Sequence, residues 1–290
     1  MPLTAAETAT ARRLIDLALA EDLDAAGDVT SLATIPGDSA GRAVIIARAA
    51  GIVAGLPVAA LVFETVDPKT TFTSAIADGT AVQSGTELAN VVGPKRSILT
   101  AERTALNFLQ RLSGVATLTR RYLDAAGGKT QVLDTRKTTP GWRLLEKYAV
   151  RMGGGHNHRV GLYDGVLIKD NHLAPFGSGP EAITKAVQAA RAKVGHTVPL
   201  EIEVDTFDQL DAALAVRPDI VLLDNMTNDQ MREAVRRRNA IAPKVLLEAS
   251  GGINLDTVRT IAETGVDRIS VGALTHSAPA LDIALDYEPS

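Results

Sequence analysis

The chain has 290 residues, a hydrophobic content of 46% and a formal net charge of −4. These totals are typical of a globular protein of one large or two modest domains, and the acidic surplus argues against a nucleic-acid-binding face. The sequence contains no cysteine, which excludes disulfides, thiolate metal ligands and cysteine nucleophiles.

The first 24 residues carry acidic side chains every few positions and lack the basic and apolar stretches of a signal peptide. The longest apolar runs, such as Gly51–Phe63, contain Gly and Pro and are too short to cross a bilayer. We therefore expect a cytoplasmic enzyme or binding protein with neither a nucleic-acid nor a membrane partner.

The sequence of the first 110 residues predicts a small α+β domain. One helix is expected near Thr4–Ala20, and another from about Ser97 to Arg111. Between them, strand-like segments are broken by turns such as Asp78-Gly79 and Ser84-Gly85. The expected strands are Ala40–Arg48, Phe72–Ala77 and Glu87–Gly93.

From about residue 131 the chain alternates short β-runs with amphipathic helices. The runs are mostly continuous Val, Ile and Leu, which is typical of parallel strands covered by helices. Two Thr-x-x-Gln capping boxes, Thr206–Gln209 and Thr227–Gln230, mark helix starts shortly after β-runs. The expected strands are Gln131–Thr135, Gly165–Lys169, Pro199–Val204, Ile220–Asp224, Lys244–Ala249 and Arg268–Val271.

Repeated β-α units either close into a barrel or wind into an open sheet. Charged, polar or small residues end almost every expected strand, which favours a barrel, because the carboxyl ends of barrel strands converge on one mouth. An open sheet would concentrate such residues at a single switch point. Six strands are expected instead of eight, so we predict an irregular, incomplete (β/α) barrel. The strand-end residues are Arg136, Lys137, Lys169, Glu203, Asp205, Asp224, Glu248, Ser250 and Gly272.

Positive charge is concentrated between Arg136 and Lys169, where seven Lys or Arg residues stand against two acids. Solvated loop charges would explain any one of these residues. A converging set, beside the flexible Gly153–Gly155, instead indicates a small, multiply anionic ligand such as a dicarboxylate or a phosphosugar, since each buried anionic oxygen needs a donor in place of water. The candidate ligands are Arg136, His158, Arg159 and Lys169.

Acidic residues alternate with apolar ones along Glu201–Asp205. Period-2 alternation puts Glu201, Glu203 and Asp205 on one face, which must point into the barrel because helices cover the Ile/Val face. Asp224 ends the next strand. Interior carboxylates need cations, so Mg²⁺ or the neighbouring Lys and Arg residues are implied; a purely structural salt-bridge network is the alternative.

Small residues follow the last two expected strands, at Ser250-Gly251-Gly252 and at Gly272-Ala273. Ser-Gly-Gly alone is most often only a turn. In this corner of a barrel, exposed backbone N–H groups on two successive loops predict a phosphate site.

The candidate site residues and the segments around them together resemble the quinolinate phosphoribosyltransferase family, the carboxylating nicotinate-nucleotide pyrophosphorylases. The resemblance extends over nearly the whole chain. The matching segments include Thr100-Ala-Glu-Arg-Thr-Ala-Leu-Asn107, Asp134-Thr-Arg-Lys-Thr-Thr-Pro-Gly141, Gly153-Gly-Gly-His-Asn-His-Arg159, Leu167-Ile-Lys-Asp-Asn-His172, Glu201-Ile-Glu-Val-Asp205, Leu222-Leu-Asp-Asn-Met226, Glu248-Ala-Ser-Gly-Gly252 and Ser270-Val-Gly-Ala-Leu-Thr-His276.

The resemblance implies an N-terminal α+β open-faced sandwich domain (residues 1–112), completed by the C-terminal tail (274–290), and a barrel domain (113–273). It also implies a homodimer, and leaves a higher oligomer open. In this dimer the sandwich of one subunit faces the barrel of the other, and Arg103 completes the partner's site.

The implied reaction joins quinolinate to phosphoribosyl pyrophosphate (PRPP) and yields nicotinate mononucleotide, pyrophosphate and CO2. Mg²⁺ is the implied cofactor, held mainly through PRPP and also by Glu203 and Asp224. The implied catalytic residues are Lys137, Lys169, Glu203 and Asp224. The implied quinolinate ligands are Arg103, Thr135, Arg136, His158, Arg159 and Lys169. The implied PRPP ligands are Arg48, Lys137, Glu203, Asp224, Ser250, Gly251, Gly252, Val271, Gly272 and Ala273.

Three rival hypotheses remain at this point. A molybdenum-transport-associated paralogue would use the same scaffold for another anionic ring substrate. A non-catalytic phosphosugar or dicarboxylate sensor would be expected to lose the interior acids, which are present here. A barrel lyase or epimerase would need a Schiff-base lysine, for which Lys169 is the candidate, although the nearby arginines favour anion pairing.

Overall fold

A computed structural model describes residues 2–287, which form two compact units. Within that range the first unit comprises residues 2–120, 138–154 and 274–287, and the second comprises 121–137 and 155–273. The expected boundary at residue 112 falls inside one helix, α4 (Lys95–Ala126), which was predicted to end near Arg111. The first unit also takes up residues 138–154, which the sequence had placed in the barrel domain.

The first unit is built on a four-stranded antiparallel sheet of order β12-β1-β5-β3. Its last strand comes from the C-terminal tail, where Ile283 pairs with Ala47 and Tyr287 with Ala43. A second pairing joins β2 to β4. The strands are β1 (Ala40–Ala47), β2 (Gly51–Ile52), β3 (Thr71–Ser74), β4 (Ala81–Val82), β5 (Glu87–Pro94) and β12 (Ile283–Tyr287).

Helices of the first unit begin at recognisable sequence signals. Thr4 caps α1 through a complete capping box with Glu7, and Asp78 accepts the N–H groups of Gly55 and Leu56 where α3 begins. In α4, a Cβ on Gly114 would lie 2.0 Å from the carbonyl oxygen of Pro279, so glycine is needed there. Besides α4, the helices are α1 (Ala5–Leu23), α2 (Val29–Thr34), α3 (Leu56–Val66), α5 (Arg143–Met152) and α11 (Ala273–His276), the last beginning at the unit boundary.

The second unit is an α/β structure around a six-stranded sheet of order β6-β11-β10-β9-β8-β7, in which all neighbours are parallel. Among the described residues, the end strands β6 and β7 do not pair with each other, so the structure is an incomplete barrel, as the sequence predicts. The strands are β6 (Gln131–Leu133), β7 (Val166–Ile168), β8 (Leu200–Val204), β9 (Ile220–Asp224), β10 (Leu246–Ser250) and β11 (Arg268–Ser270).

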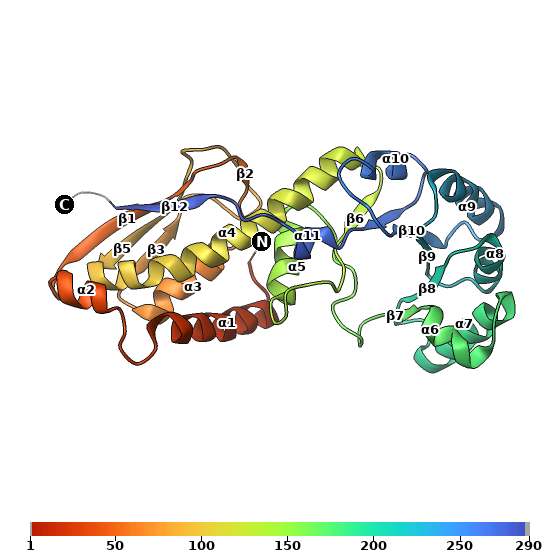
Figure 1. Ribbon diagram of the computed structural model, residues 1–290, viewed down its shortest axis with the longest axis horizontal. Helices are drawn as coiled ribbons and strands as arrows, with labels where there is room; N and C mark the ends of the chain where they lie inside the picture. The colour runs from red at the N-terminus through yellow and green to blue at the C-terminus, as the bar shows by residue number, and fades with distance from the viewer. Residues whose placement is uncertain (1, 288–290) are drawn as a thin grey trace. The chain divides into compact units, whose positions relative to one another are not determined.

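Helices cover the outer face of this sheet, where α7, α8 and α9 follow one another beside β8, β9 and β10 (Figure 1). Both predicted capping boxes are present at Thr206 and Thr227. The helical segments are α6 (Asp170–Leu173), the 3₁₀ turn η1 (Ala174–Phe176), α7 (Pro180–Val194), α8 (Phe207–Val216), α9 (Asn228–Ile241) and α10 (Val258–Ala262). Among the described residues, no helix combines the length and apolar composition that a membrane crossing requires.

Candidate active site

The carboxyl ends of the six parallel strands bring most of the predicted site residues to one edge of the second unit. Each of these residues lies in the last positions of a strand or in the loop that follows it. They are Thr135, Arg136 and Lys137 after β6, Lys169 after β7, Glu203 in β8, Asp224 in β9, Ser250, Gly251 and Gly252 at the end of β10, and Val271, Gly272 and Ala273 after β11.

The register confirms that the acids on β8 face the barrel interior. Glu203 lies in one row with Leu222 of β9, Glu248 of β10 and Arg268 of β11, and residues paired in neighbouring strands share a face. Glu201 shares that face with Glu203, whereas Ile202 and its neighbours on the opposite face are buried. Asp205 is exposed beyond the strand end.

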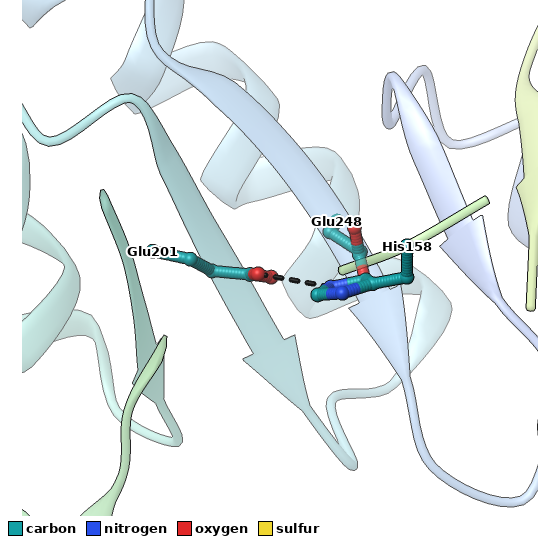
Figure 2. Close-up of side chains that lie close together, drawn as sticks. All are labelled: His158, Glu201 and Glu248. Atoms are coloured by element: carbon teal, nitrogen blue, oxygen red, sulfur yellow. Dashed lines mark ion pairs between the residues drawn. The ribbon is translucent and has the colours of Figure 1, made fainter. Parts of the chain in front are cut away.

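Inside the barrel, His158 contacts two buried carboxylates (Figure 2). Its Nε2 lies 2.9 Å from Oε2 of Glu201 and 3.4 Å from Oε1 of Glu248. Arg268 approaches Glu248 from the other side, with Nε 2.9 Å from Oε2, although its N–H does not point at that oxygen. Two acids and two basic side chains therefore form a compact network, which we call the buried quartet.

The acids of the buried quartet decide the charge of His158. Burial lowers the pKa of the imidazole, but the hydrogen bonds and charges of Glu201 and Glu248 outweigh burial and raise the pKa to about 9. The Arg159 N–H, 2.8 Å from Nδ1, can donate to that nitrogen only in the neutral ring, so protonation of His158 exchanges this hydrogen bond for charged contacts with the two acids. Burial and the charge of Glu248 also raise the pKa of Glu201.

Two arginines near the mouth form a positive site with little internal compensation. Nε of Arg136 is buried and has no hydrogen-bond partner among the described residues. Burial lowers the pKa of Arg159, and the charge of Arg136 lowers it further against the opposing effects of Glu201 and Asp164. Because two half-buried guanidinium groups of like charge repel each other, this arrangement favours an anion between or beside them.

A cation and an acid form an ion pair on neighbouring strands. Nζ of Lys169 contacts Oε2 of Glu203. On the next strand Asp224 accepts a hydrogen bond from the side-chain amide of Asn225 at 2.8 Å. The basic side of the site, with Arg136, Arg159 and Lys169, therefore meets the acidic side, with Glu203 and Asp224, at β7 and β8.

The loop after β10 is shaped for close backbone approach. Gly251 has a φ of 99°, and a Cβ there would lie 2.1 Å from Oδ1 of Asn225, so only glycine fits. Asn225 itself has a φ of 53° and donates its N–H to the carbonyl oxygen of Ser250 at 3.1 Å. Ser250 to Gly252 and Val271 to Ala273 follow adjacent strands, as a phosphate loop pair requires.

Two predicted residues belong to the first unit. Arg103 is exposed on α4, and its guanidinium makes no hydrogen bond or ion pair with another described residue. Arg48 is exposed at the end of β1, where its guanidinium pairs with Asp286 of β12.

Sequence reasoning missed the residues that support the site. Arg268 and Glu248 were not assigned to a network, because period-2 alternation gives the face of each side chain but not the register that pairs the two strands. Asp134 is fully buried and accepts the N–H of His158 at 2.9 Å and the amide of Asn157 at 2.6 Å. Thr135, which was predicted as a quinolinate ligand, is half-buried and accepts the N–H of Lys137 at 3.0 Å, so its hydroxyl also shapes the basic loop.

Comparison with known proteins gives two family matches. Residues 28–113 match the quinolinate phosphoribosyl transferase N-terminal domain, and residues 115–286 match the C-terminal domain. A nicotinate-nucleotide pyrophosphorylase [carboxylating] from Mycobacterium leprae is 47% identical over 95% of this chain and 96% of its own length. A probable enzyme of the same name from Bacillus subtilis is 43% identical over 95% and 92%. The structure of NadC from Streptococcus pyogenes superposes with a TM-score of 0.91 at 38% identity, covering both chains completely.

The raised pKa of His158 predicts a pH-dependent stability. A charged His158 stabilises the fold fully below its ordinary pKa of 6.5, and this contribution is lost as the pH rises through about 9. The free energy of unfolding should therefore fall across this interval by on the order of 2 kcal/mol more in the wild type than in His158→Asn. Urea unfolding at pH 6.5, 8 and 10 measures this difference. Parallel pH curves for the two proteins would show that His158 is not charged in the folded state.

Proposed function

The chain belongs to the quinolinate phosphoribosyltransferase family, and on that premise we propose how its own residues carry out the family's reaction. The protein transfers the phosphoribosyl group of PRPP to quinolinate with decarboxylation, a step of NAD biosynthesis that yields nicotinate mononucleotide, pyrophosphate and CO2. The observation that best fits this substrate is the half-buried guanidinium pair of Arg136 and Arg159, because quinolinate presents two adjacent carboxylates.

Quinolinate is assigned to the basic side of the site. Arg136 and Arg159 would pair with its carboxylates, and the Lys169 ammonium would exchange part of its contact with Glu203 for the substrate. Thr135 supports this loop through its hydroxyl. His158 has both ring nitrogens engaged within the protein, so direct binding to quinolinate would need a change of partner.

PRPP is assigned to the acidic strands and the glycine-containing loops. Glu203 and Asp224 face the region where the ribose hydroxyls would lie, and Lys137 follows β6 where a diphosphate oxygen would need a cation. The backbone N–H groups of Gly251, Gly252 and Ala273 suit the 5′-phosphate, whereas that of Val271 already donates to the carbonyl oxygen of Leu133 at 2.9 Å.

Magnesium enters this proposal with PRPP. Glu203 and Asp224 offer the carboxylate oxygens that Mg²⁺ prefers, on adjacent parallel strands. One other group of potential ligands was found among the described residues: His158, Glu201 and Glu248, whose ligand atoms all lie within 4.8 Å of one another. Arg268 already compensates Glu248 there, and an imidazole suits Mg²⁺ poorly, so this group fits the ion less well.

The chemistry requires charge compensation and positioning, with no side-chain nucleophile. Departure of pyrophosphate leaves positive charge at the ribose C1′, which the carboxylates of Glu203 and Asp224 would stabilise. The pyridine nitrogen then forms the bond to C1′ and becomes cationic. Loss of CO2 from ring C2 leaves an electron pair beside that cationic nitrogen, and the carbon is then protonated. The arginines hold the second carboxylate throughout.

The second subunit is also part of the proposal. Arg103 is an exposed, unpaired arginine on α4, and the family resemblance assigns it to the site of a partner subunit in a homodimer. Arg48 would reach the diphosphate only by giving up part of its ion pair with Asp286. The cytoplasmic location expected from the sequence stays a prediction.

Substrate selection tests the assignment to quinolinate. With PRPP and Mg²⁺, the protein should convert quinolinate to nicotinate mononucleotide and release CO2, whereas kcat/KM for nicotinate should be at least about 100-fold lower because one pairing partner of the arginines is missing. Arg136→Ala should raise KM for quinolinate, and Arg236→Ala, an exposed arginine on α9, serves as the control. Equal turnover of nicotinate would contradict recognition through two carboxylates.

Subunit mixing tests the shared site. At a quinolinate concentration near the wild-type KM, Arg103→Ala and Arg136→Ala should each be nearly inactive. After co-expression and random pairing, half of the dimers are mixed and each has one intact site, so about a quarter of wild-type activity should return. Co-expression of two differently tagged copies of Arg136→Ala is the matched control. A dimeric mixture that regains no activity would show that Arg103 does not act across the interface.

A further inference from the structure

The barrel has an open seam between its end strands β6 and β7. The chain crosses this seam through residues 155–165, which we call the seam segment. One isolated bridge pairs His156 with Leu133 of β6, with hydrogen bonds of 2.9 and 3.1 Å. Beyond it, Asp164 accepts the N–H groups of Val160 and Gly161 at 2.6 and 2.8 Å, so hydrogen bonds within the segment hold part of it together.

His158 joins the seam segment to strands on the other side of the barrel. From a backbone position just past the bridge to β6, its ring reaches Glu201 on β8 and Glu248 on β10 (Figure 2). Arg268 extends this connection to β11. The side chain of His158 is 11% exposed and that of Glu248 is fully buried, so solvent competes little with these contacts.

The buried quartet remains favourable only while its charges are balanced. Glu201 and Glu248 contribute two carboxylates, and His158 and Arg268 contribute the opposing groups. Arg268 approaches Glu248 alone, whereas His158 approaches both acids. Removing the charge of Glu248 would therefore leave Arg268 uncompensated and would weaken one of the two contacts that orient the imidazole.

The orientation of the imidazole is transmitted to Arg159. The backbone N–H of Arg159 donates to Nδ1 of His158 at 2.8 Å, and its guanidinium Nη1 donates to the carbonyl oxygen of Gly165 at 3.0 Å. Both ends of Arg159 are thus held by the seam segment, and the ring of His158 fixes one of them. A shift of the ring would move the guanidinium relative to Arg136.

We propose that Glu248 and Arg268 are positioning residues for the acceptor half of the site. Through His158 they hold the seam segment against the barrel interior and so place Arg159 for a carboxylate of the acceptor. This inference rests on the proposed function of Arg159. It gives Glu248 and Arg268 a role at a distance from the substrate, and it separates them from Glu203 and Asp224, which serve the phosphoribosyl half.

Steady-state kinetics of Glu248→Gln and Arg268→Gln test the proposal. Each variant should raise KM for quinolinate by about 10-fold or more, because misplacing one ligand costs transition-state and substrate contacts, while KM for PRPP stays within about twofold. Arg268→Lys, which keeps the charge, should recover most of the loss. Glu181→Gln, an exposed acid on α7, is the matched control.

A spectroscopic measurement accompanies the kinetics. In ¹⁵N-histidine-labelled protein, the ring resonances of His158, assigned with His158→Asn, should shift in Glu248→Gln and in Arg268→Gln but not in Glu181→Gln. Glu248 and Arg268 lie at opposite ends of one contact, so either variant still tests the proposal if the other fails to fold.

Distinct outcomes separate this inference from the proposed function. Unshifted His158 resonances, or equal increases in KM for both substrates, would overturn the positioning role. If the wild type itself does not convert quinolinate, the proposed function is wrong, and the His158 resonances alone then decide whether Glu248 and Arg268 orient the ring.

Discussion

The constraint on which the rest of the site depends is the need to balance two carboxylates, Glu201 and Glu248, inside the barrel. Burying an unpaired carboxylate is costly enough that such a group must find a cation or bind a proton. Here His158 and Arg268 provide that compensation from opposite sides. Because these two partners balance the charge of the interior acids, Arg136 and Arg159 are not needed for that purpose and remain available for a ligand.

Charge is therefore divided along one edge of the sheet. Arg136 and Arg159 form the positive half, and Glu203 and Asp224 form the negative half, with the Lys169–Glu203 ion pair between them. The division matches a reaction in which an anionic ring meets a ribosyl centre that becomes positive. Neither half needs a nucleophile, since the ring nitrogen supplies the electron pair and the pyridinium accepts the one released by decarboxylation. The contribution of the protein is positioning and electrostatic compensation.

Much of this organisation could be predicted from the sequence, because it follows from residue patterns within single strands and at helix starts. Period-2 alternation showed that Glu201 and Glu203 share a face, and the capping boxes at Thr206 and Thr227 placed two helix starts. Contacts that depend on register between distant segments could not be predicted. The row that joins Glu248 to Arg268 needs the β10–β11 register, and the reach of His158 across the seam needs the positions of three strands. The full length of α4 was also missed, because Ser113-Gly114 resembles a helix end, whereas Gly114 allows the close approach to Pro279.

The central claim is that an arginine pair, left free by the internal balance of the buried acids, recognises two adjacent carboxylates. Calorimetric binding of phthalate and benzoate tests it without turnover, because the two rings differ by one carboxylate and lack the reactive nitrogen. We predict that phthalate binds at least about 10-fold more tightly than benzoate, and that Arg159→Ala removes most of this preference. Equal affinities for the two compounds, or a preference that survives in both Arg136→Ala and Arg159→Ala, would contradict the claim.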